Sequence, residues 1–243
     1  MGLGTNRLTD TPGHEAFLRD AAMAGIGLVD TAHLYTGGNS ERTIGSALAT
    51  MPLDRRPVVA TKGGYGAGEN RPEVLRGQIE QSLRSLQVDT IDLYYLHRAH
   101  PDTPLEDSLG EIRRWVDRGA IRLVGLSQVG IEQIDQGRTV VPIAAVQNHY
   151  NLGERRWDAV IDHCHREGIV FVPFFPLRDM GGGVAERIAA HQGLAPSQVA
   201  LAWLLRRSPA VLPIPGTLSG AHLRENLATL DLDLDAEVIG QLS

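Results

Sequence analysis

Three apolar runs of the chain end on residues that apolar runs normally avoid. Gly-Ile-Gly-Leu-Val ends at Asp30, Val-Val-Ala-Thr ends at Lys62, and Ile-Asp-Leu-Tyr-Tyr-Leu ends at His97. Tyr35 follows the first of these runs after a short loop. An acid, a base and a phenol at the ends of buried strands can form a proton-transfer site, because burial and neighbouring charges move their pKa values toward neutrality.

The elements that must position these residues alternate along the chain. Short runs rich in Val, Ile and Leu predict strands near residues 2–6, 26–30, 57–62, 91–96, 121–126, 142–146, 169–174 and 211–214. Segments of helical spacing between them predict helices near residues 13–24, 40–50, 71–87, 106–118, 131–138, 155–167, 183–206 in two pieces, 220–230 and 235–241.

The strands read as continuous apolar runs, as parallel strands covered by helices on both faces do. Eight such strands, evenly spaced, favour an α/β fold of the (β/α)8 TIM-barrel type, in a single domain over residues 1–243. A Rossmann fold is disfavoured because no G-x-G-x-x-G turn follows the first strands. The glycine-rich stretch 63–68 lacks that spacing and is interpreted as a flexible loop.

In a (β/α)8 barrel, functional side chains gather where the carboxyl ends of the strands meet. Polar residues occur at this end of five successive predicted strands, namely Asp30, Lys62, His97, Ser127 with Gln128, and Gln147 with Asn148. Any one of them alone has an alternative interpretation as the solvated start of a loop. Their recurrence favours a common site.

The composition limits the partners of the protein. Its 243 residues include 42% hydrophobic and 21% charged residues and carry a formal charge of −6, without a basic stripe for nucleic acid. No apolar run is long enough for a membrane span, and Met1 is followed by no signal-like segment, so we expect a cytoplasmic protein. The single cysteine, Cys164, is expected to be a buried, inert thiol.

Several segments in order along the chain resemble the aldo-keto reductase superfamily. The resemblance rests on Val-Asp-Thr-Ala-His-Leu-Tyr (29–35), Asn-Ser-Glu-Arg-Thr-Ile-Gly (39–45), Ala-Thr-Lys-Gly (60–63), Asp-Leu-Tyr-Tyr-Leu-His (92–97), Gly-Leu-Ser (125–127), Ala-Val-Gln-Asn (145–148), Pro-Ile-Pro-Gly-Thr (213–217) and Leu-Arg-Glu-Asn (223–226). It implies reduction of aldehydes or ketones to alcohols by an NAD(P)H-dependent enzyme.

The resemblance implies a catalytic tetrad of Asp30, Tyr35, Lys62 and His97. Tyr35 is the expected proton donor, which must lie within about 3 Å of the developing alkoxide. We expect Lys62 to lower the pKa of Tyr35, and Asp30 to hold Lys62 charged in a buried pair. His97 is expected to hydrogen-bond the substrate oxygen. The alternative is a structural ion pair, a satisfied core histidine and a packed loop tyrosine.

The resemblance also implies a nicotinamide cofactor, because no side chain can supply a hydride. Ser127, Gln128, Asn148 or Gln147 would hold the carboxamide, with Gln147 the strongest match, and Phe174 would stack on the ring. The helix starting near Ser219 would offer backbone N–H groups to phosphate. The full set of implied cofactor contacts is Gly4, Thr5, Asn6, Asp30, Ser127, Gln128, Gln147, Phe174, Pro176, Leu177, Ile214, Pro215, Gly216, Thr217, His222, Glu225 and Asn226.

The cofactor preference depends on the segment expected to hold the 2′-phosphate. Gly216, Thr217 and His222 stand where the family places a lysine, a serine and an arginine, although Arg224 is close enough to substitute. We therefore expect NADP (NADPH), with NAD as the alternative. Glu225 is expected near the adenine, as is Asn226.

Family members usually carry an N-terminal hairpin and a C-terminal tail, whereas this sequence begins almost on its first predicted strand, so the resemblance leads us to expect a short, bacterial-type variant. We expect an open pocket lined by Tyr35, Tyr65, Trp157 and Phe175, with broad specificity for small carbonyl substrates. We also expect a monomer or weak homo-oligomer that binds neither nucleic acid nor a membrane.

No metal site is predicted. His163 and His165 would diverge on a helix, and no carboxylate can be placed beside His97 and His100 to complete a set of ligands. Two other functions remain open. One is a nucleotide-binding accessory or regulatory protein with little turnover, and the other is a barrel lyase or hydrolase.

Overall fold

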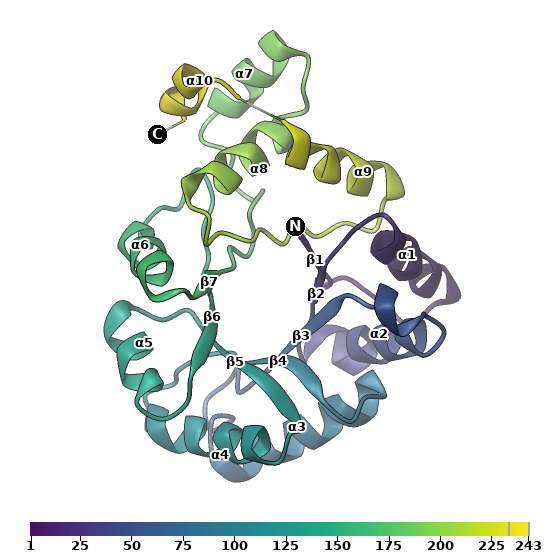
Figure 1. Ribbon diagram of the computed structural model, residues 1–243, viewed down its shortest axis with the longest axis vertical. Helices are drawn as coiled ribbons and strands as arrows, with labels where there is room; N and C mark the ends of the chain where they lie inside the picture. Colours follow the sequence, from purple (N-terminus) through teal and green to yellow (C-terminus); the bar gives the residue numbers. More distant parts are fainter. Residues whose placement is uncertain (233, 243) are drawn as a thin grey trace.

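The computed structural model describes residues 1–232 and 234–242 and contains one parallel sheet in which the strands follow chain order. The strands are β1 (Gly2–Gly4), β2 (Leu28–Asp30), β3 (Val58–Gly63), β4 (Ile91–Leu96), β5 (Ile121–Ser127), β6 (Ile143–Gln147) and β7 (Val170–Phe171). Each is hydrogen-bonded in parallel to its sequence neighbour. The sheet curls into a ring with helices around its outside (Figure 1).

The helices lie close to their predicted ranges. They are α1 (Pro12–Met23), α2 (Asn39–Ala49), α3 (Pro72–Leu86), α4 (Leu105–Asp117), α5 (Ile131–Arg138), α6 (Asp158–Glu167), α7 (Val184–Gln192), α8 (Pro196–Arg207), α9 (Gly220–Ala228) and α10 (Ala236–Gln241). Short 3-10 turns are η1 (Tyr35–Gly38), η2 (Leu53–Arg55) and η3 (Thr229–Asp231). The predicted α/β alternation is therefore confirmed.

The predicted eighth strand, 211–214, is not a regular strand, but its backbone joins the two edges of the sheet. On one side, Leu212 N–H donates to the carbonyl of Phe171 in β7 (2.9 Å). On the other, the carbonyls of Pro213 and Pro215 accept from two N–H groups of β1 at 3.0 and 3.3 Å. Proline has no N–H to donate, so this segment can accept from β1 but cannot form a complete ladder.

Strand β7 is also shorter than its predicted range, 169–174. Pro173 interrupts it, yet Val172 N–H still donates to Val146 (2.7 Å) and Phe174 N–H to Asn148 (3.1 Å). Phe174 is thus aligned beside the end of β6 although it lies outside the assigned strand.

Side chains of the strands alternate between the interior of the ring and the helix layer. In β4, Tyr95 belongs to the cluster inside the ring with Leu93, whereas Tyr94 packs in the larger cluster under the helices. Gly125 in β5 leaves room for Tyr95, because an added Cβ would lie 2.3 Å from that ring. The same alternation directs His97, two residues beyond Tyr95, toward the inside of the ring.

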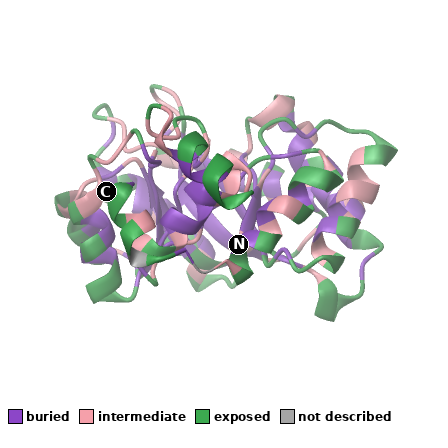
Figure 2. Ribbon diagram, turned by 90° about the horizontal axis from the view of Figure 1, so that it is seen from above, coloured by how far each residue is buried: buried purple, intermediate pink, exposed green. Residues whose placement is uncertain are grey.

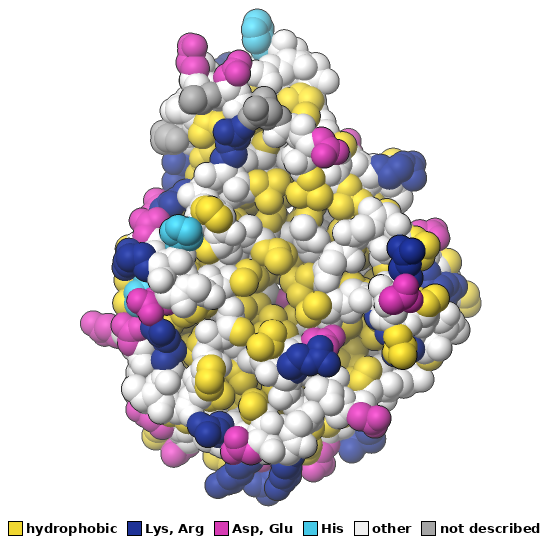
Figure 3. Space-filling model, in the orientation of Figure 1, with side chains coloured by type: hydrophobic (Ala, Val, Ile, Leu, Met, Phe, Trp, Pro, Cys, Tyr) yellow, Lys and Arg dark blue, Asp and Glu magenta, His cyan; other side chains and the backbone are white. Residues whose placement is uncertain are grey.

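Buried residues concentrate in the strands and on the inner faces of the helices (Figure 2). On the face shown in Figure 3, hydrophobic side chains gather over the centre of the ring and most charged side chains lie around its rim. In the part of the chain that the structure describes, no helix is long and apolar enough to cross a membrane.

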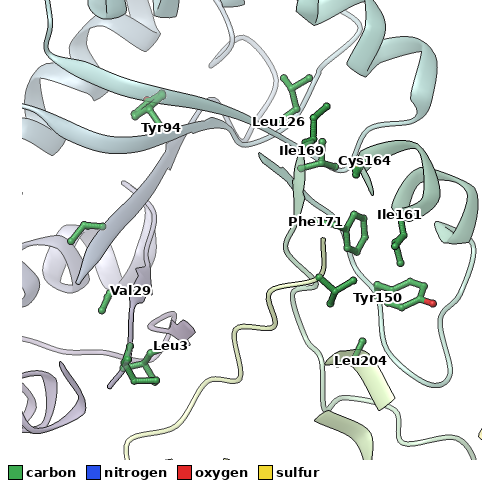
Figure 4. Close-up of a cluster of buried hydrophobic side chains, with 14 of the residues drawn as sticks. Leu3, Val29, Tyr94, Leu126, Tyr150, Ile161, Cys164, Ile169, Phe171 and Leu204 are labelled. Carbon is green, nitrogen blue, oxygen red and sulfur yellow. The ribbon is translucent and has the colours of Figure 1, made fainter. Parts of the chain in front are cut away.

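The layer between the sheet and the helices holds most of the core. Figure 4 shows Phe171 of β7 beside Ile161 and Cys164 of α6, with Tyr150 next to them. The ring centroids of Tyr150 and Phe171 are 5.8 Å apart, edge to face. Cys164 is fully buried, and burial raises the pKa of its thiol to about 12, as expected for an inert cysteine.

Candidate active site

A cavity of about 540 Å³ lies at the carboxyl ends of the strands. Asp30 from the end of β2, Tyr35 from η1 and His97 from the residue after β4 line it. Lys62 from β3 lies behind this wall, with none of its surface exposed. The structure therefore brings the four predicted catalytic side chains together from the ends of β2, β3 and β4 and from η1.

Asp30 and Lys62 form a fully buried ion pair. Lys62 Nζ donates to Asp30 Oδ1 (2.6 Å) and to the backbone carbonyl of Thr31 (2.6 Å). Gln147 Nε2 donates to the other carboxylate oxygen, Oδ2 (2.7 Å). Both oxygens of Asp30 are thus satisfied, as a buried carboxylate requires. The ammonium is held in one place.

Tyr35 lies over this ion pair, with Lys62 Nζ 5.1 Å from its ring centroid. Burial raises the pKa of Tyr35 above its usual value, and the charge of Lys62 only partly offsets this by lowering it. Lys62 therefore lowers the pKa of Tyr35 as expected, but desolvation of the phenolate outweighs the effect of this cation. The phenol consequently stays protonated at neutral pH.

His97 faces both tyrosines of the cavity edge-on, with ring centroids 6.2 Å from Tyr35 and 4.8 Å from Tyr65. Burial, together with the nearby charges of Lys62 and Arg98, lowers the pKa of His97 to about 2. The imidazole is therefore neutral, so it can act as a hydrogen-bonding group beside Tyr35. Its Nδ1 is buried without a hydrogen-bond partner.

The lining of the cavity next to Asp30 contains the residues expected to hold a nicotinamide. Ser127 and Gln147 end β5 and β6, both buried, and Phe174 lies beside them. His149 stacks on Phe174 at 5.4 Å with an interplanar angle of 17°, and it does not line the cavity. It therefore supports Phe174 from behind. The residues present fit a flat aromatic amide.

Most of the predicted cofactor contacts line this cavity. These are Gly4, Thr5, Asn6, Asp30, Ser127, Gln147, Phe174, Pro176, Leu177, Ile214, Pro215 and Gly216. The cavity does not reach the other predicted contacts, which are Gln128, Thr217, His222, Glu225 and Asn226.

The side chains of Gln128, Glu225 and Asn148 already have hydrogen-bond partners within the protein. The first two were predicted as cofactor contacts, and Asn148 was a candidate for holding the carboxamide. Gln128 Oε1 accepts from the backbone N–H of His149 (2.9 Å). Glu225 accepts from the hydroxyl of Ser197 in α8 (2.6 Å). The side-chain amide of Asn148 is bonded to both backbone groups of Val129. That pairing makes Asn148 a poor carboxamide ligand.

The pocket lining was predicted correctly for Tyr35, Tyr65 and Phe175, all of which line the cavity. The prediction for Trp157 is wrong, because this side chain packs against the core outside the cavity. Trp157 directly precedes α6 and packs with the core residues of that helix layer.

Sequence reasoning missed four residues that line the cavity, namely Arg7, Leu34, Arg98 and Arg178. One signal was available for Arg98, which directly follows His97 at a strand end. The others lie in loops, where the sequence has no periodicity to indicate which way a side chain points. Among residues 1–232 and 234–242, no group of three or more His, Cys, Asp or Glu side chains could hold a metal ion.

Comparisons with known proteins identify the family of the chain. The model of the aldo/keto reductase family matches residues 1–184 and 181–243. An uncharacterized oxidoreductase of Schizosaccharomyces pombe is 35% identical over 262 residues, covering 100% of this chain and 85% of that protein. The pyridoxine 4-dehydrogenase of Escherichia coli is 36% identical over 241 residues, covering 93% and 84%.

The fold is also similar to that of a solved structure. The aldo/keto reductase from Klebsiella pneumoniae in complex with NADP and acetate superimposes with a TM-score of 0.87 at 29% identity, covering 99% of this chain and 89% of that one. The family match spans nearly every described element. The chain therefore belongs to the aldo/keto reductase family.

Proposed function

We propose that this protein reduces aldehydes or ketones to alcohols with NADPH, using Tyr35 as the proton donor. The observation that carries the proposal is the buried Asp30–Lys62 pair directly behind Tyr35, with neutral His97 beside it on the same cavity. A structural ion pair would have no need of a phenol and an imidazole at an open cavity.

The four residues would act on the carbonyl oxygen of the substrate. His97 and Tyr35 would hydrogen-bond this oxygen, and Tyr35 would donate its proton as negative charge develops there. Lys62 would stabilise the phenolate that remains, since its ammonium is held 5.1 Å from the ring centroid. Asp30 would keep Lys62 charged and in position, and Gln147 would keep Asp30 in position.

When bound, a reduced nicotinamide would supply the hydride for the carbonyl carbon. Phe174 would provide the stacking face, and Ser127 and Gln147 would bind the carboxamide. The NADP complex of the Klebsiella pneumoniae relative supports NADP as the cofactor. Arg7 and Arg178 line the cavity near Gly216 and Phe175, where they could meet phosphate groups.

We also infer that segment 210–216 takes the place of the eighth strand of a closed (β/α)8 barrel in a single domain. Its hydrogen bonds to β7 and β1 support this inference, as does the TM-score of 0.87 to the Klebsiella pneumoniae enzyme.

The test compares Tyr35→Phe with wild type, using NADPH and 4-nitrobenzaldehyde. The substitution removes only the acidic hydroxyl, so kcat should fall by about 100- to 10,000-fold, whereas NADPH affinity by fluorescence titration should change little. Tyr94→Phe is the matched control, because its buried hydroxyl has no hydrogen-bond partner and it packs under the helices.

Three outcomes separate the alternatives. Equal turnover by Tyr35→Phe and wild type would exclude Tyr35 as the donor. Wild type that binds NADPH but reduces no aldehyde would favour a regulatory nucleotide-binding protein. Tighter binding of NADH than of NADPH would overturn the assignment of NADP.

A further inference from the structure

Arg98 is a positively charged residue of the cavity that the proposed reaction does not use. It follows His97, is half-buried, and lines the cavity. Its backbone is held at both groups, because its N–H donates to Gly64 (3.1 Å) and its carbonyl accepts from Asn70. The position of this residue is therefore determined by the loops after β3 and β4.

The guanidinium of Arg98 is also held in place. Its Nη1 donates to the carbonyl of His97 (3.0 Å) and to the hydroxyl of Ser127 (3.2 Å). Its Cζ lies 5.2 Å from the ring centroid of Tyr65 and 6.0 Å from that of Phe174. Such contacts with aromatic faces favour a cation and restrict its side-chain rotamers. Arg98 is thus fixed beside the catalytic end of the cavity.

Among the residues that the structure describes, this cation has no anionic partner. Across residues 1–232 and 234–242, no carboxylate forms an ion pair with Arg98, and its Nε and Nη2 have no hydrogen-bond acceptor. Asp30 is the one carboxylate among the described residues that line the cavity, and Lys62 already neutralises it. A half-buried, unpaired guanidinium is favourable only when an anion or water completes its hydrogen bonds.

We propose that Arg98 determines substrate specificity by binding a carboxylate of the substrate, so that the preferred substrates are carbonyl compounds with a carboxylate. This inference rests on the proposed function. Nε and Nη2 form one edge of the planar guanidinium, and their two parallel N–H groups match the two oxygens of a carboxylate. Nη1, on the other side, is occupied by His97 and Ser127.

The location of Arg98 argues against a role in binding the cofactor phosphates. Its contacts are His97, Ser127, Tyr65 and Phe174, which belong to the end of the cavity where the carbonyl and the nicotinamide would lie. The arginines suited to the phosphates, Arg7 and Arg178, contact other parts of the wall.

The test compares acids with their neutral esters. Wild type should reduce 3-carboxybenzaldehyde or 4-carboxybenzaldehyde with a kcat/KM about 10- to 100-fold above that of the matching methyl ester, as expected for a charge-assisted hydrogen bond. Arg98→Met should abolish this preference by raising KM for the acid. Arg98→Lys keeps the positive charge but loses the two parallel N–H groups of the guanidinium, so it should retain an intermediate preference for the acid.

Arg122→Met is the matched control, because it removes an exposed arginine from the opposite end of β5, where Arg122 pairs with Asp92. It should keep the wild-type ratio of acid to ester. Benzoate has a carboxylate but no aldehyde or ketone group, so it should inhibit wild type competitively with the aldehyde. Its inhibition constant should be at least about 10-fold higher for Arg98→Met.

The failures of the two proposals can be told apart. Wild type that reduces acid and ester equally well, or prefers the ester, overturns the role of Arg98 and leaves the reductase intact. Equal losses for acid and ester in Arg98→Met, with weaker NADPH binding, would instead assign Arg98 to the cofactor. Wild type that reduces no aldehyde overturns the proposed function and this inference together. Melting temperatures verify that each variant is folded.

Discussion

Lys62 is the only lysine of the chain, and it is fully buried at the centre of the site. The cationic side chains that line the cavity, Arg7, Arg98 and Arg178, are all arginines. Burial acts on Tyr35 and His97 in opposite directions, because it disfavours the charged form of each. It raises the pKa of the phenol and lowers that of the imidazole, so both stay neutral at pH 7.

The lowered pKa of His97 predicts that the folded protein loses stability as the pH falls. Below its usual pKa of about 6.5 the unfolded chain binds a proton at His97 and the folded chain does not, so the free energy of unfolding falls as pH falls. The effect continues down to about 2, the pKa in the folded state. Its slope is at most about 1.4 kcal/mol per pH unit.

His97→Gln should remove this dependence. Urea unfolding at about pH 7 and about pH 5 should show that the variant loses about 2 kcal/mol less stability than wild type. His191→Gln, which removes an exposed histidine from α7, controls for the loss of a histidine as such. The same pH dependence in His97→Gln and wild type would contradict the buried, neutral state of His97.

Among the elements, the approach of α2 to α3 depends on one glycine. A Cβ at Gly45 would lie 2.4 Å from the carbonyl oxygen of Ser85 and 2.8 Å from the carbonyl carbon of Leu86. Backbone atoms cannot move aside as a flexible side chain can. Helix α2 therefore packs on α3 only at the distance that glycine permits.

Gly45→Ala should destabilise the fold by about 1–3 kcal/mol in urea or thermal unfolding, because the helices must separate. Gly77→Ala is the control within α3, where a Cβ would meet no atom within 4 Å. Removing glycine from an open helix position should stabilise by about 0.5–1 kcal/mol. If the two variants changed stability equally, the close packing of α2 on α3 would be refuted.

At the scale of the whole molecule, the charge of the chain and the charge of the cavity have opposite signs. The chain has a formal charge of −6, whereas Arg7, Arg98 and Arg178 line the cavity and its one described carboxylate is paired. Screening limits charge interactions to about 8 Å at 0.15 M salt, so an anionic ligand in the cavity responds mainly to these arginines. The surface charge then contributes little.

This arrangement predicts that salt weakens cofactor binding. Raising NaCl from about 0.05 M to about 0.5 M should increase the Kd of NADPH severalfold in a fluorescence titration, because screening reduces attraction by the cavity arginines. A chain whose overall negative charge dominated would bind NADPH more tightly in salt, which is the opposite result. Potassium acetate in place of NaCl tests whether chloride itself competes for the arginines.

The sequence by itself determined which residues end the strands, because the period of a strand or helix is local and apolar runs record it. The helices and seven strands of the sheet could therefore be predicted, together with Asp30, Lys62 and His97 at strand ends. The grouping of Tyr35 with these three residues came from the family resemblance. The irregular eighth segment could be understood only with the structure, since Pro213 and Pro215 depend on β1 for their hydrogen-bond donors.

Tertiary structure alone decided the properties that depend on neighbours distant in the chain. The net pKa of Tyr35 is raised because burial outweighs the charge of Lys62. The support of Phe174 by His149 and the position of Trp157 outside the cavity depend on how separate loops and helices pack. Arg98 is visible in the sequence, but its free edge and its lack of a carboxylate partner follow from what surrounds it in three dimensions.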